Sequence, residues 1–443
     1  MRGRVVRPIV EFLSTESAAG VVLVAATLVA LVWANSPWND TYTDILTTTI
    51  TIDLGFVDVS EDVHHWVNDG LMTIFFFVVG LEIKRELLMG ELNSVRRAAL
   101  PVAAALGGMV VPAALYLALN AGGEGEDGWG IPMATDIAFA VGLLALLGTR
   151  APFALRVFLL ALAIVDDLGA IAVIAVFYTD DLAVDALGIA LGFIALILVM
   201  QRANVRDVPL YIPVGALLWL ALLKSGVHAT IAGVILGILT PHLPFTTREE
   251  FTHRASEITS RLQGLLGRKR EEETVDEERY ALQSLEDLTR DSESPLERLE
   301  HFLHPWSSFG IVPIFALANA GIELNADTIS DALESEVMYG IVLGLVVGKT
   351  VGIFAASWLA VRSGMAELPA GVRWPQMLGV AMLAGVGFTV SLFITELAFT
   401  DAELVGDAKI GILGASAIAG AAGFAYLWMV AERAPEVEPS LNR

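Results

Sequence analysis

The sequence predicts an all-α polytopic membrane protein, and three observations lead to this prediction. Hydrophobic residues make up 55% of the 443 residues, and the mean hydropathy is +0.65. Soluble proteins are typically about 45–50% apolar. Apolar runs long enough to cross a bilayer recur from residue 17 to residue 430. The acidic residues gather in the segments between these runs, which gives the chain alternating apolar spans and polar loops.

About twelve transmembrane helices are expected, and several of them are near the lower length limit for a span. A polar segment, residues 241–304, divides the expected spans into two groups. Spans 1–8 lie within residues 17–240, and spans 9–12 lie within residues 305–431. The two terminal segments are residues 1–16 and 432–443. The expected spans are 17–34, 68–88, 97–119, 132–148, 153–177, 183–200, 209–223, 227–240, 306–323, 337–360, 374–397 and 405–430.

The distribution of basic residues predicts the orientation of these spans. If the N-terminus is cytoplasmic, all but three of the 27 Lys and Arg residues fall on the cytoplasmic side. The exceptions are Lys224, Lys349 and Lys409. Loops rich in Lys and Arg stay in the cytoplasm, so both termini are predicted to be cytoplasmic. The basic N-terminus lacks a small-residue cleavage site at the usual place, and we interpret it as a retained segment.

The net charge argues against nucleic acid as a partner, and the cysteine content excludes disulfide bonds. The formal net charge is −23, so nucleic acid is not an expected partner. Acidic loops are either ordinary solvated segments or an adaptation to high salt, and the sequence leaves both interpretations open. The chain has no cysteine, which excludes disulfides. Nothing in the sequence calls for a cofactor.

Two polar segments outside the spans have a predicted structure. Residues 35–65 carry alternating Thr, Ile, Asp and Val, which indicates a short external β-hairpin. An exposed hairpin can pair edge to edge with a second copy, so a homodimer through 35–65 is expected. The segment 241–304 is predicted to be a mobile, acidic cytoplasmic linker with helices at 248–270 and 276–290 and no core of its own.

Asp166 and Asp167 are the most informative pair of residues. They lie in the middle of the apolar run 153–177. One charge at the bilayer centre costs at least about 2.5–3.5 kcal/mol, and adjacent like charges cost more. Carboxylates are also suitable ligands for a hard cation such as Na⁺. The pair therefore indicates a protein that binds and moves protons or cations.

Two spans show signs of interruption at comparable positions in the two halves of the chain. The fourth span follows a Gly-rich loop and carries Thr135 and Asp136 near its start. The eleventh span contains Gly385 and Gly387, and glycine in a helix interior costs about 1 kcal/mol. Unwound backbone inside a membrane is tolerated only beside a cavity. The two interruptions therefore point to a transport site.

Lys349 is a lone basic residue inside the tenth span. A buried ammonium group must pair with an acid or lose its proton, and Asp166 and Asp167 are its expected partners. Competition between an ion and protons at shared carboxylates is the minimal chemistry of an antiporter. A purely structural role is the alternative for each of these groups: helix–helix hydrogen bonding for the aspartate pair, helix capping for Asp136, ion pairing for Lys349, and close helix packing for Gly385 and Gly387.

At these residues the sequence resembles the NhaA family of Na⁺/H⁺ antiporters. Matching motifs occur in order from about residue 17 to residue 430. They are FFFVVGLEIKREL (75–87), MATDIAFAVG (133–142), LALAIVDDLGAIAVIA (160–175), LKSGVHATIAGVILG (223–237), LEHFLHPW (299–306), PIFALANAGI (313–322), GKTVGIF (348–354) and AGVGFTVSLFI (384–394).

The resemblance implies a twelve-helix fold with an inverted repeat and broken helices 4 and 11; this family is itself a standard example of such an architecture. It also implies electrogenic export of cytoplasmic Na⁺ or Li⁺ in exchange for external protons across a prokaryotic cell membrane. By motif match, Asp166 and Asp167 bind Na⁺, and Lys349 pairs with Asp166. Thr135 and Asp136 match the helix-4 break. The implied pH-sensing residues are Glu82, Arg85, Glu86, Glu300 and His301.

One departure from the family pattern and two alternative functions accompany this interpretation. The segment 241–304 is longer and more acidic than the family's usual linker, which leaves the pH response undefined. A Na⁺-coupled symporter of an organic anion would need a basic substrate pocket, and only Lys349 is available for one. An intramembrane aspartyl protease, the enzyme alternative, would carry its aspartates on separate helices, whereas Asp166 and Asp167 are adjacent.

Overall fold

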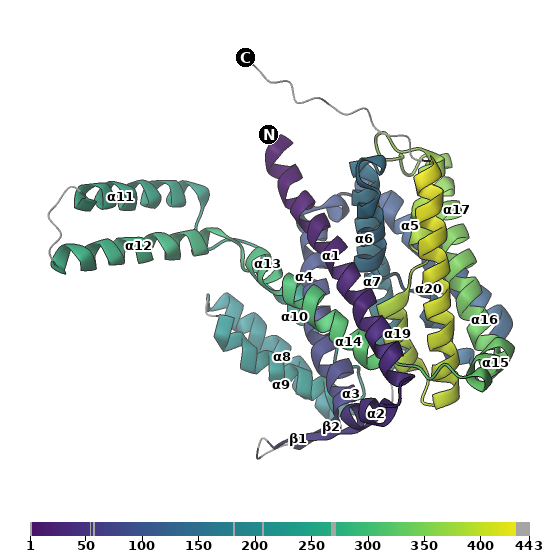
Figure 1. The fold of residues 1–443 in the computed structure, drawn as a ribbon. Coiled ribbons are helices and arrows are strands. Elements are labelled where there is room, and N and C mark those ends of the chain that lie inside the picture. The colour runs from purple at the N-terminus through teal and green to yellow at the C-terminus, as the bar shows by residue number, and fades with distance from the viewer. Residues whose placement is uncertain are drawn as a thin grey trace.

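The computed structural model describes residues 2–53, 55, 58–179, 182–205, 208–266 and 272–430, and they form a mainly helical protein (Figure 1). The predicted tail 432–443 lies outside the described residues. The first part of the chain contains α1 (Arg2–Ala34), α2 (Asn39–Thr47), β1 (Thr49–Asp53), β2 (Asp58–Asp62), α3 (Val63–His65), α4 (Met72–Met89), α5 (Val95–Asn120), α6 (Ile137–Leu146), α7 (Phe153–Phe177), α8 (Val184–Arg202), α9 (Val208–Leu223) and α10 (Ile231–Leu239).

The second part begins with the two helices of the polar segment and then returns to apolar helices. It contains α11 (Arg248–Leu266), α12 (Glu272–Ser292), α13 (Pro295–Trp306), α14 (Val312–Asn319), α15 (Ala326–Glu334), α16 (Glu336–Val342), α17 (Lys349–Arg362), α18 (Trp374–Leu383), α19 (Phe388–Ala398) and α20 (Ala402–Val430).

The number of helices that meet a length and hydropathy criterion for spanning is smaller than twelve. In the part of the chain that the structure describes, seven helical segments are long and apolar enough to cross a bilayer, and nine qualify if each of two bent pairs is one span. Several predicted spans are too short to qualify alone. α10 has nine residues, α14 has eight and α9 has 16, whereas a perpendicular helix needs about 20.

Single π-helical turns join three pairs of helices into longer ones. They lie at Trp66–Leu71, Ser307–Ile311 and Leu343–Gly348. The second of these joins α13 to α14, so the helix begins well before the predicted boundary at residue 306. The reason is a helix-start signal inside the predicted linker: Ser294 accepts a hydrogen bond from the Glu297 backbone N–H, and Pro295 occupies the first turn.

Both interruptions expected from the sequence have a counterpart in the backbone. A 3₁₀ segment, Glu126–Met133, is followed by non-helical residues 134–136 and then by α6. α18 and α19 are separated by four residues and bent by 46°. A Cβ at Gly385 would lie 2.4 Å from the Leu345 carbonyl oxygen. Glycine at this position thus allows the α18–α19 break to lie directly against the π-helical turn that precedes Lys349.

The segment 35–65 is part helix and part hairpin. β1 and β2 pair antiparallel, with Thr49 opposite Asp62 and Asp53 opposite Asp58. Residues 39–47, which we expected to belong to the hairpin, instead form the short helix α2. The polar threonines and aspartates of this stretch alternate with apolar residues at helical spacing, and Tyr42 is its buried contact.

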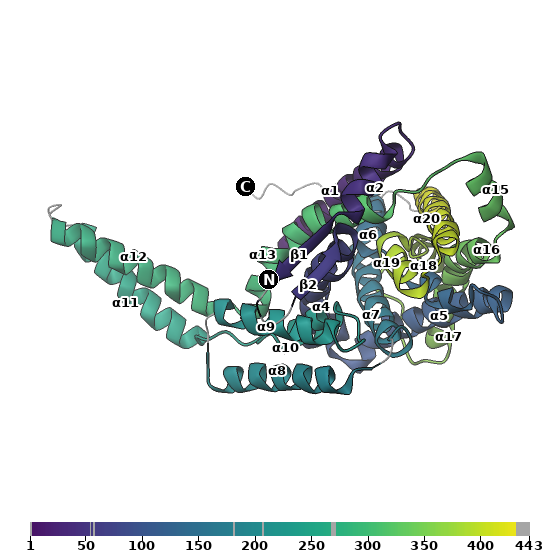
Figure 2. The same cartoon turned by 90° about the horizontal axis from the view of Figure 1, so that it is seen from below.

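α11 and α12 form an antiparallel pair that projects from one side of the body (Figures 1 and 2). Leu265, Ala281 and Leu288 are buried in this pair, so the segment has a short apolar seam that the sequence analysis did not anticipate. Its two ends are close together, because the backbone N–H groups of Phe245 and Thr246 both donate to the Asp291 carbonyl at 3.0 Å.

The start of α1 and the end of α20 lie at the same end of the molecule, and the hairpin lies at the opposite end (Figure 1). Between these ends, α5 and α17 cross at very close range. A Cβ at Gly352 would lie 2.1 Å from the Gly107 carbonyl oxygen, so each glycine lets the other helix approach. This crossing positions the first residue of α17, Lys349, inside the protein.

Candidate ion-binding site

Residues from three separate elements meet in the interior between the two helix breaks. α7 contributes Asp166 and Asp167, α17 contributes Lys349, and the non-helical residues before α6 contribute Thr135 and Asp136. All five are buried: Lys349 and Thr135 are 0% exposed, and Asp167, the most accessible of them, is 4% exposed. The structure thus brings together all five of the candidate transport residues that the sequence singled out.

Lys349 links the aspartate pair to one of the breaks. Its Nζ donates to Asp166 Oδ2 at 2.5 Å and to Thr135 Oγ1 at 2.7 Å. The Thr135 hydroxyl in turn donates to the Ala384 carbonyl at 2.9 Å. Ala384 caps the C-terminal end of α18, where backbone carbonyls carry partial negative charge. The ammonium group therefore pairs with a carboxylate directly and is linked to a helix C-terminus through the Thr135 hydroxyl.

Asp136 holds the N-terminal ends of the two continuing helices together. Its Oδ1 accepts from the Phe139 N–H of α6 at 2.9 Å. Its Oδ2 accepts from the Thr389 hydroxyl at 2.6 Å and from the Thr389 N–H at 3.2 Å, at the start of α19. The Asp136 N–H also donates to the Val386 carbonyl at 2.7 Å. A carboxylate at two helix N-termini is stabilised by both partial positive charges.

The two aspartates of α7 have unequal partners. Asp166 shares the Lys349 ammonium group, and Asp167 has no comparable ion pair among the described residues. No hydrogen-bond donor of the described chain reaches Oδ1 of either aspartate. A buried polar atom without a partner costs about 1–3 kcal/mol, and more when the group is charged. These oxygens are therefore suited to accept a proton or a small cation.

A second polar cluster connects α4 to α13. Arg85 forms an ion pair with Glu300, and its Nη2 lies 3.8 Å from Glu86 Oε1. Glu82 Oε1 lies 4.0 Å from His304 Nε2. Burial raises the pKa of Glu300, an effect that the Arg85 charge partly offsets. The cluster thus contains a buried acid whose protonation depends on the position of one arginine.

One of the expected pH-sensing residues is outside this cluster. His301 is exposed, whereas His304 faces Glu82. The sequence contained a signal for this difference, because Glu300 and His304 are four residues apart and share one face of α13. His301 follows Glu300 directly and points to another face. The hydroxyl of Thr389 is the other contact that the sequence analysis missed, since it depends on how two distant breaks meet.

Comparison with known proteins agrees with the motifs. The model of the family described as Na⁺/H⁺ antiporter 1 matches residues 10–427. "Na(+)/H(+) antiporter NhaA 2" of Sorangium cellulosum is 48% identical over 412 residues, which cover 93% of this chain and 87% of the relative. "Na(+)/H(+) antiporter NhaA" of Rhodopirellula baltica is 47% identical over 424 residues, or 96% of this chain and 94% of the relative.

Solved structures give a much weaker match. The sodium proton antiporter MjNhaP1 from Methanocaldococcus jannaschii is 12% identical, covers 96% of this chain and 98% of its own, and has a TM-score of 0.45. That similarity is too low to bear on the details of this fold. The conclusion rests on the sequence relatives and on the family model, whose match extends over nearly the whole chain: this protein is a member of the Na⁺/H⁺ antiporter 1 family.

Proposed function

We propose that this protein is an electrogenic antiporter that exports cytoplasmic Na⁺ or Li⁺ in exchange for external protons. The observation that carries the proposal is the buried aspartate pair: among the described residues, an oxygen of each carboxylate has no donor, and Asp166 but not Asp167 has a lysine partner. The relatives at 45–48% identity are named as Na⁺/H⁺ antiporters. Secondary transport by a membrane protein fits these observations.

In this proposal Asp167 is the principal ligand of the transported cation, and Asp166 is the second. A cation approaching the pair displaces protons, because two adjacent carboxylates cannot both ionise cheaply without a counter-charge. The cation then competes with the Lys349 ammonium group for Asp166. Loss of the Lys349 pair frees the ammonium group to give up a proton, so more than one proton can be exchanged for each cation.

The proposed architecture has twelve spans, with an inverted repeat and broken spans 4 and 11. The observed helices supply twelve segments when the short ones are included: α1, α4, α5, α6, α7, α8, α9, α10, α14, α16–α17, α18–α19 and α20. α13, which carries Glu300, is then a cytoplasmic extension that precedes span 9. The two breaks fall in the fourth and the eleventh segments, and the interlocking of Asp136 and Thr389 supports their equivalence.

We further infer a prokaryotic plasma-membrane location with both termini cytoplasmic. The support is the bias of basic residues and the shared position of the start of α1 and the end of α20 (Figure 1). The hairpin then lies outside and offers an edge for a homodimer. Glu82, Arg85, Glu86 and Glu300 form the proposed cytoplasmic pH-sensing cluster, in which His304 takes the position expected for His301.

Reconstitution tests the activity directly. Purified protein in liposomes that contain a pH-sensitive dye should build a pH gradient when a Na⁺ gradient is imposed, and an organic anion should have no effect. An electrogenic exchanger should also respond to membrane potentials set by K⁺ and valinomycin. Absence of Na⁺-driven proton movement in an active preparation would overturn the proposal, and indifference to potential would restrict it to one-for-one exchange.

A further inference from the structure

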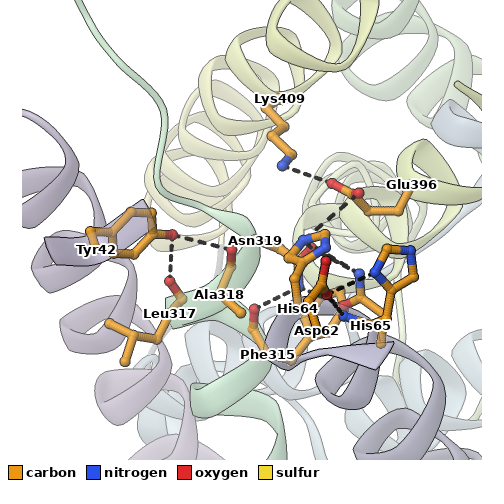
Figure 3. A network of polar contacts seen from close by, with 11 residues as sticks. Tyr42, Asp62, His64, His65, Phe315, Leu317, Ala318, Asn319, Glu396 and Lys409 are labelled. Carbon is orange, nitrogen blue, oxygen red and sulfur yellow. Dashed lines mark hydrogen bonds and ion pairs between the residues drawn. The ribbon is translucent and has the colours of Figure 1, made fainter. Parts of the chain in front are cut away.

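A second group of potential ligands lies at the other end of the molecule from the termini, where the hairpin joins the helical body. Asp62 is the last residue of β2, and His64 and His65 belong to the short helix α3 that follows. Figure 3 shows these side chains converging beside Asn319 and Glu396. One ligand atom from each of Asp62, His64 and His65 lies within 4.8 Å of the others.

We propose that Asp62, His64 and His65 bind a divalent transition-metal ion such as Zn²⁺. One carboxylate oxygen and two imidazole nitrogens form a common ligand set for Zn²⁺, at bond lengths of about 2.0–2.2 Å. Three protein ligands leave a fourth position for water. The side chain of His65 is 57% exposed, so an ion can reach the group from solvent. The transported cation is a different case, because a hard ion such as Na⁺ has little preference for imidazole.

The hydrogen bonds around Asn319 indicate which ring nitrogen of His64 carries a proton. The Asn319 amide Nδ2 donates to Asn68 Oδ1 at 2.8 Å and to the Phe315 carbonyl at 3.0 Å. The Asn319 oxygen is therefore the atom that faces His64 Nε2, at 3.0 Å. His64 Nε2 therefore carries a proton, and in the neutral ring the lone pair of Nδ1 is the one that can bind a metal. Metal-binding histidines typically donate their second N–H in this way.

Asp62 and His65 are already in contact, at a separation that an ion would change only slightly. Asp62 Oδ1 lies 2.7 Å from His65 Nδ1 and accepts from the His65 backbone N–H at 2.8 Å. Two ligands of a tetrahedral Zn²⁺ lie about 3.3 Å apart at these bond lengths. Binding therefore replaces the proton between the two side chains with the metal ion and opens the contact by about half an ångström. The backbone bond can remain and hold the carboxylate in place.

Local charge also favours a cation here. Glu61 and Asp69 are close enough to act electrostatically on His65, and Glu396 Oε2 lies 3.8 Å from His64 Nε2. Lys409, a lysine that acts electrostatically on His64, forms a 2.7 Å ion pair with Glu396 Oε1. The remaining acidic side chains leave a negative potential at the group, which attracts a divalent ion from the external solution. This argument does not depend on the proposed antiport activity.

Metal titration of the full chain tests the proposal. The protein is purified in detergent without a polyhistidine tag and titrated with Zn²⁺ by calorimetry and with Co²⁺ by visible absorption. We expect one tight equivalent and Co²⁺ bands typical of tetrahedral coordination. His65→Ala and Asp62→Asn should each weaken binding about tenfold or more, since even outer-shell partners of a metal contribute about 10–100-fold. His253→Ala and His301→Ala remove exposed histidines elsewhere and serve as matched controls.

A footprinting measurement on the unmodified chain provides a readout that does not depend on a variant folding. Diethylpyrocarbonate modifies accessible imidazoles, and Zn²⁺ should protect His65 but leave His253 and His301 reactive. Equal modification of His65 with and without Zn²⁺ would overturn the proposal. So would equal Zn²⁺ affinity in the starting protein and the His65→Ala variant, or an equal loss in the two control variants. In that case Asp62 and His65 form only a helix-capping pair.

Discussion

Asp167 lies deep in the protein with one carboxylate oxygen that receives no hydrogen bond from the described chain. We predict that Asp167→Asn abolishes Na⁺/H⁺ exchange and leaves the protein folded. The amide keeps the shape of the side chain but removes the charge that attracts a cation, and it has no proton to exchange near neutral pH. Proteoliposome exchange assays measure the activity, and thermal unfolding in detergent measures the fold.

The matched control for this change is Asp44→Asn, which makes the same substitution at an exposed position of α2. It should leave exchange and stability unchanged. Substantial exchange by a folded Asp167→Asn protein would contradict the assignment of Asp167 as the principal cation ligand.

The Lys349–Asp166 pair makes a second prediction, which concerns stability. Both side chains are essentially inaccessible to solvent, so Lys349→Met leaves a buried carboxylate without its partner. Breaking a buried ion pair from one side costs about 3–5 kcal/mol. The double variant Asp166→Asn/Lys349→Met should recover much of this loss, because no unpaired charge remains. Thermal unfolding of the three proteins in detergent measures the coupling, and an unaltered midpoint for Lys349→Met would contradict it.

Glu300 gives a prediction about pH. Burial raises its pKa above the ordinary value of 4.5, although Arg85 opposes the shift. The folded protein therefore binds this proton more tightly than the unfolded chain does. The contribution of this proton to the free energy of unfolding is fully present below pH 4.5 and is lost as the pH rises through the folded-state pKa of Glu300. Glu300→Gln does not titrate, so its unfolding midpoint relative to the unmodified protein should rise across that window.

The exchange rate of the Glu300→Gln variant distinguishes an independent pH gate from direct competition between Na⁺ and protons. Saturating Na⁺ relieves direct competition between Na⁺ and protons, but it does not relieve an independent gate. At saturating Na⁺, the exchange rate of Glu300→Gln should depend less on pH than that of the unmodified protein. Identical pH profiles would remove Glu300 from the pH response. Glu297→Gln, which changes a nearby acid in the first turn of α13, is the control.

At the residue scale, the sequence alone predicted which groups meet but not how they bond. Asp166, Asp167 and Lys349 were identifiable because a charge inside an apolar span needs a reason to be there. The resemblance implied that Lys349 pairs with Asp166, whereas its second bond, to Thr135, depends on how α17 lies against the non-helical residues before α6. His304 could have been found from its four-residue spacing to Glu300, since that spacing places both on one helix face.

At the scale of elements, the close crossing of α5 and α17 positions Lys349. Gly352→Ala places a Cβ 2.1 Å from the Gly107 carbonyl oxygen, so the two helices must separate. Because Lys349 lies one turn before Gly352 on the same helix, we predict that the change lowers both stability and exchange. Gly192→Ala in α8 is the matched control, since a Cβ there meets nothing within 4 Å.

In an open site the same substitution should stabilise the helix by about 1 kcal/mol, because alanine has the higher helix propensity. The unfolding midpoint should therefore fall for Gly352→Ala and rise for Gly192→Ala. The exchange rate should fall only for Gly352→Ala. Equal behaviour of Gly352→Ala and Gly192→Ala would show that the crossing tolerates extra volume and does not position Lys349.

Element boundaries were predictable where apolar periodicity decided them and not where tertiary contacts did. α7 has the bounds that its apolar run predicts. α18 ends at Leu383 and α19 begins at Phe388, so Gly385 and Gly387 lie between the two helices. The continuation of α13 into α14 through a π-helical turn was not predicted, because a single inserted residue leaves no periodic trace in a short segment.

At the scale of the whole molecule, the order of apolar and polar segments predicted the body of the protein but not the form of the insert. α11 and α12 have the helical charge pattern that the sequence showed, yet their pairing and projection depend on a few buried residues such as Leu265 and Ala281. The insert is attached beside two residues of α4. Lys84 Nζ donates to the Thr240 carbonyl, where α10 ends, at 2.6 Å, and Arg85 pairs with Glu300 of α13.

This attachment predicts the outcome of deleting the projection. Because the Phe245 and Thr246 N–H groups lie 3.0 Å from the Asp291 carbonyl, a short glycine-serine turn can replace residues 247–290 without moving either end. The aspartate pair and both helix breaks lie in other elements, so the deleted protein should still exchange Na⁺ for protons at saturating Na⁺. Its pH profile should be retained as well, because Lys84, Arg85 and the bond from the Leu296 N–H to the Pro241 carbonyl still join the ends of α10 and α13. Proteoliposome exchange measured across pH tests both expectations, and replacing the helices with an unrelated helical hairpin of the same length is the control. Loss of all exchange in a deleted protein with a normal unfolding midpoint would show that the projection takes part in transport itself.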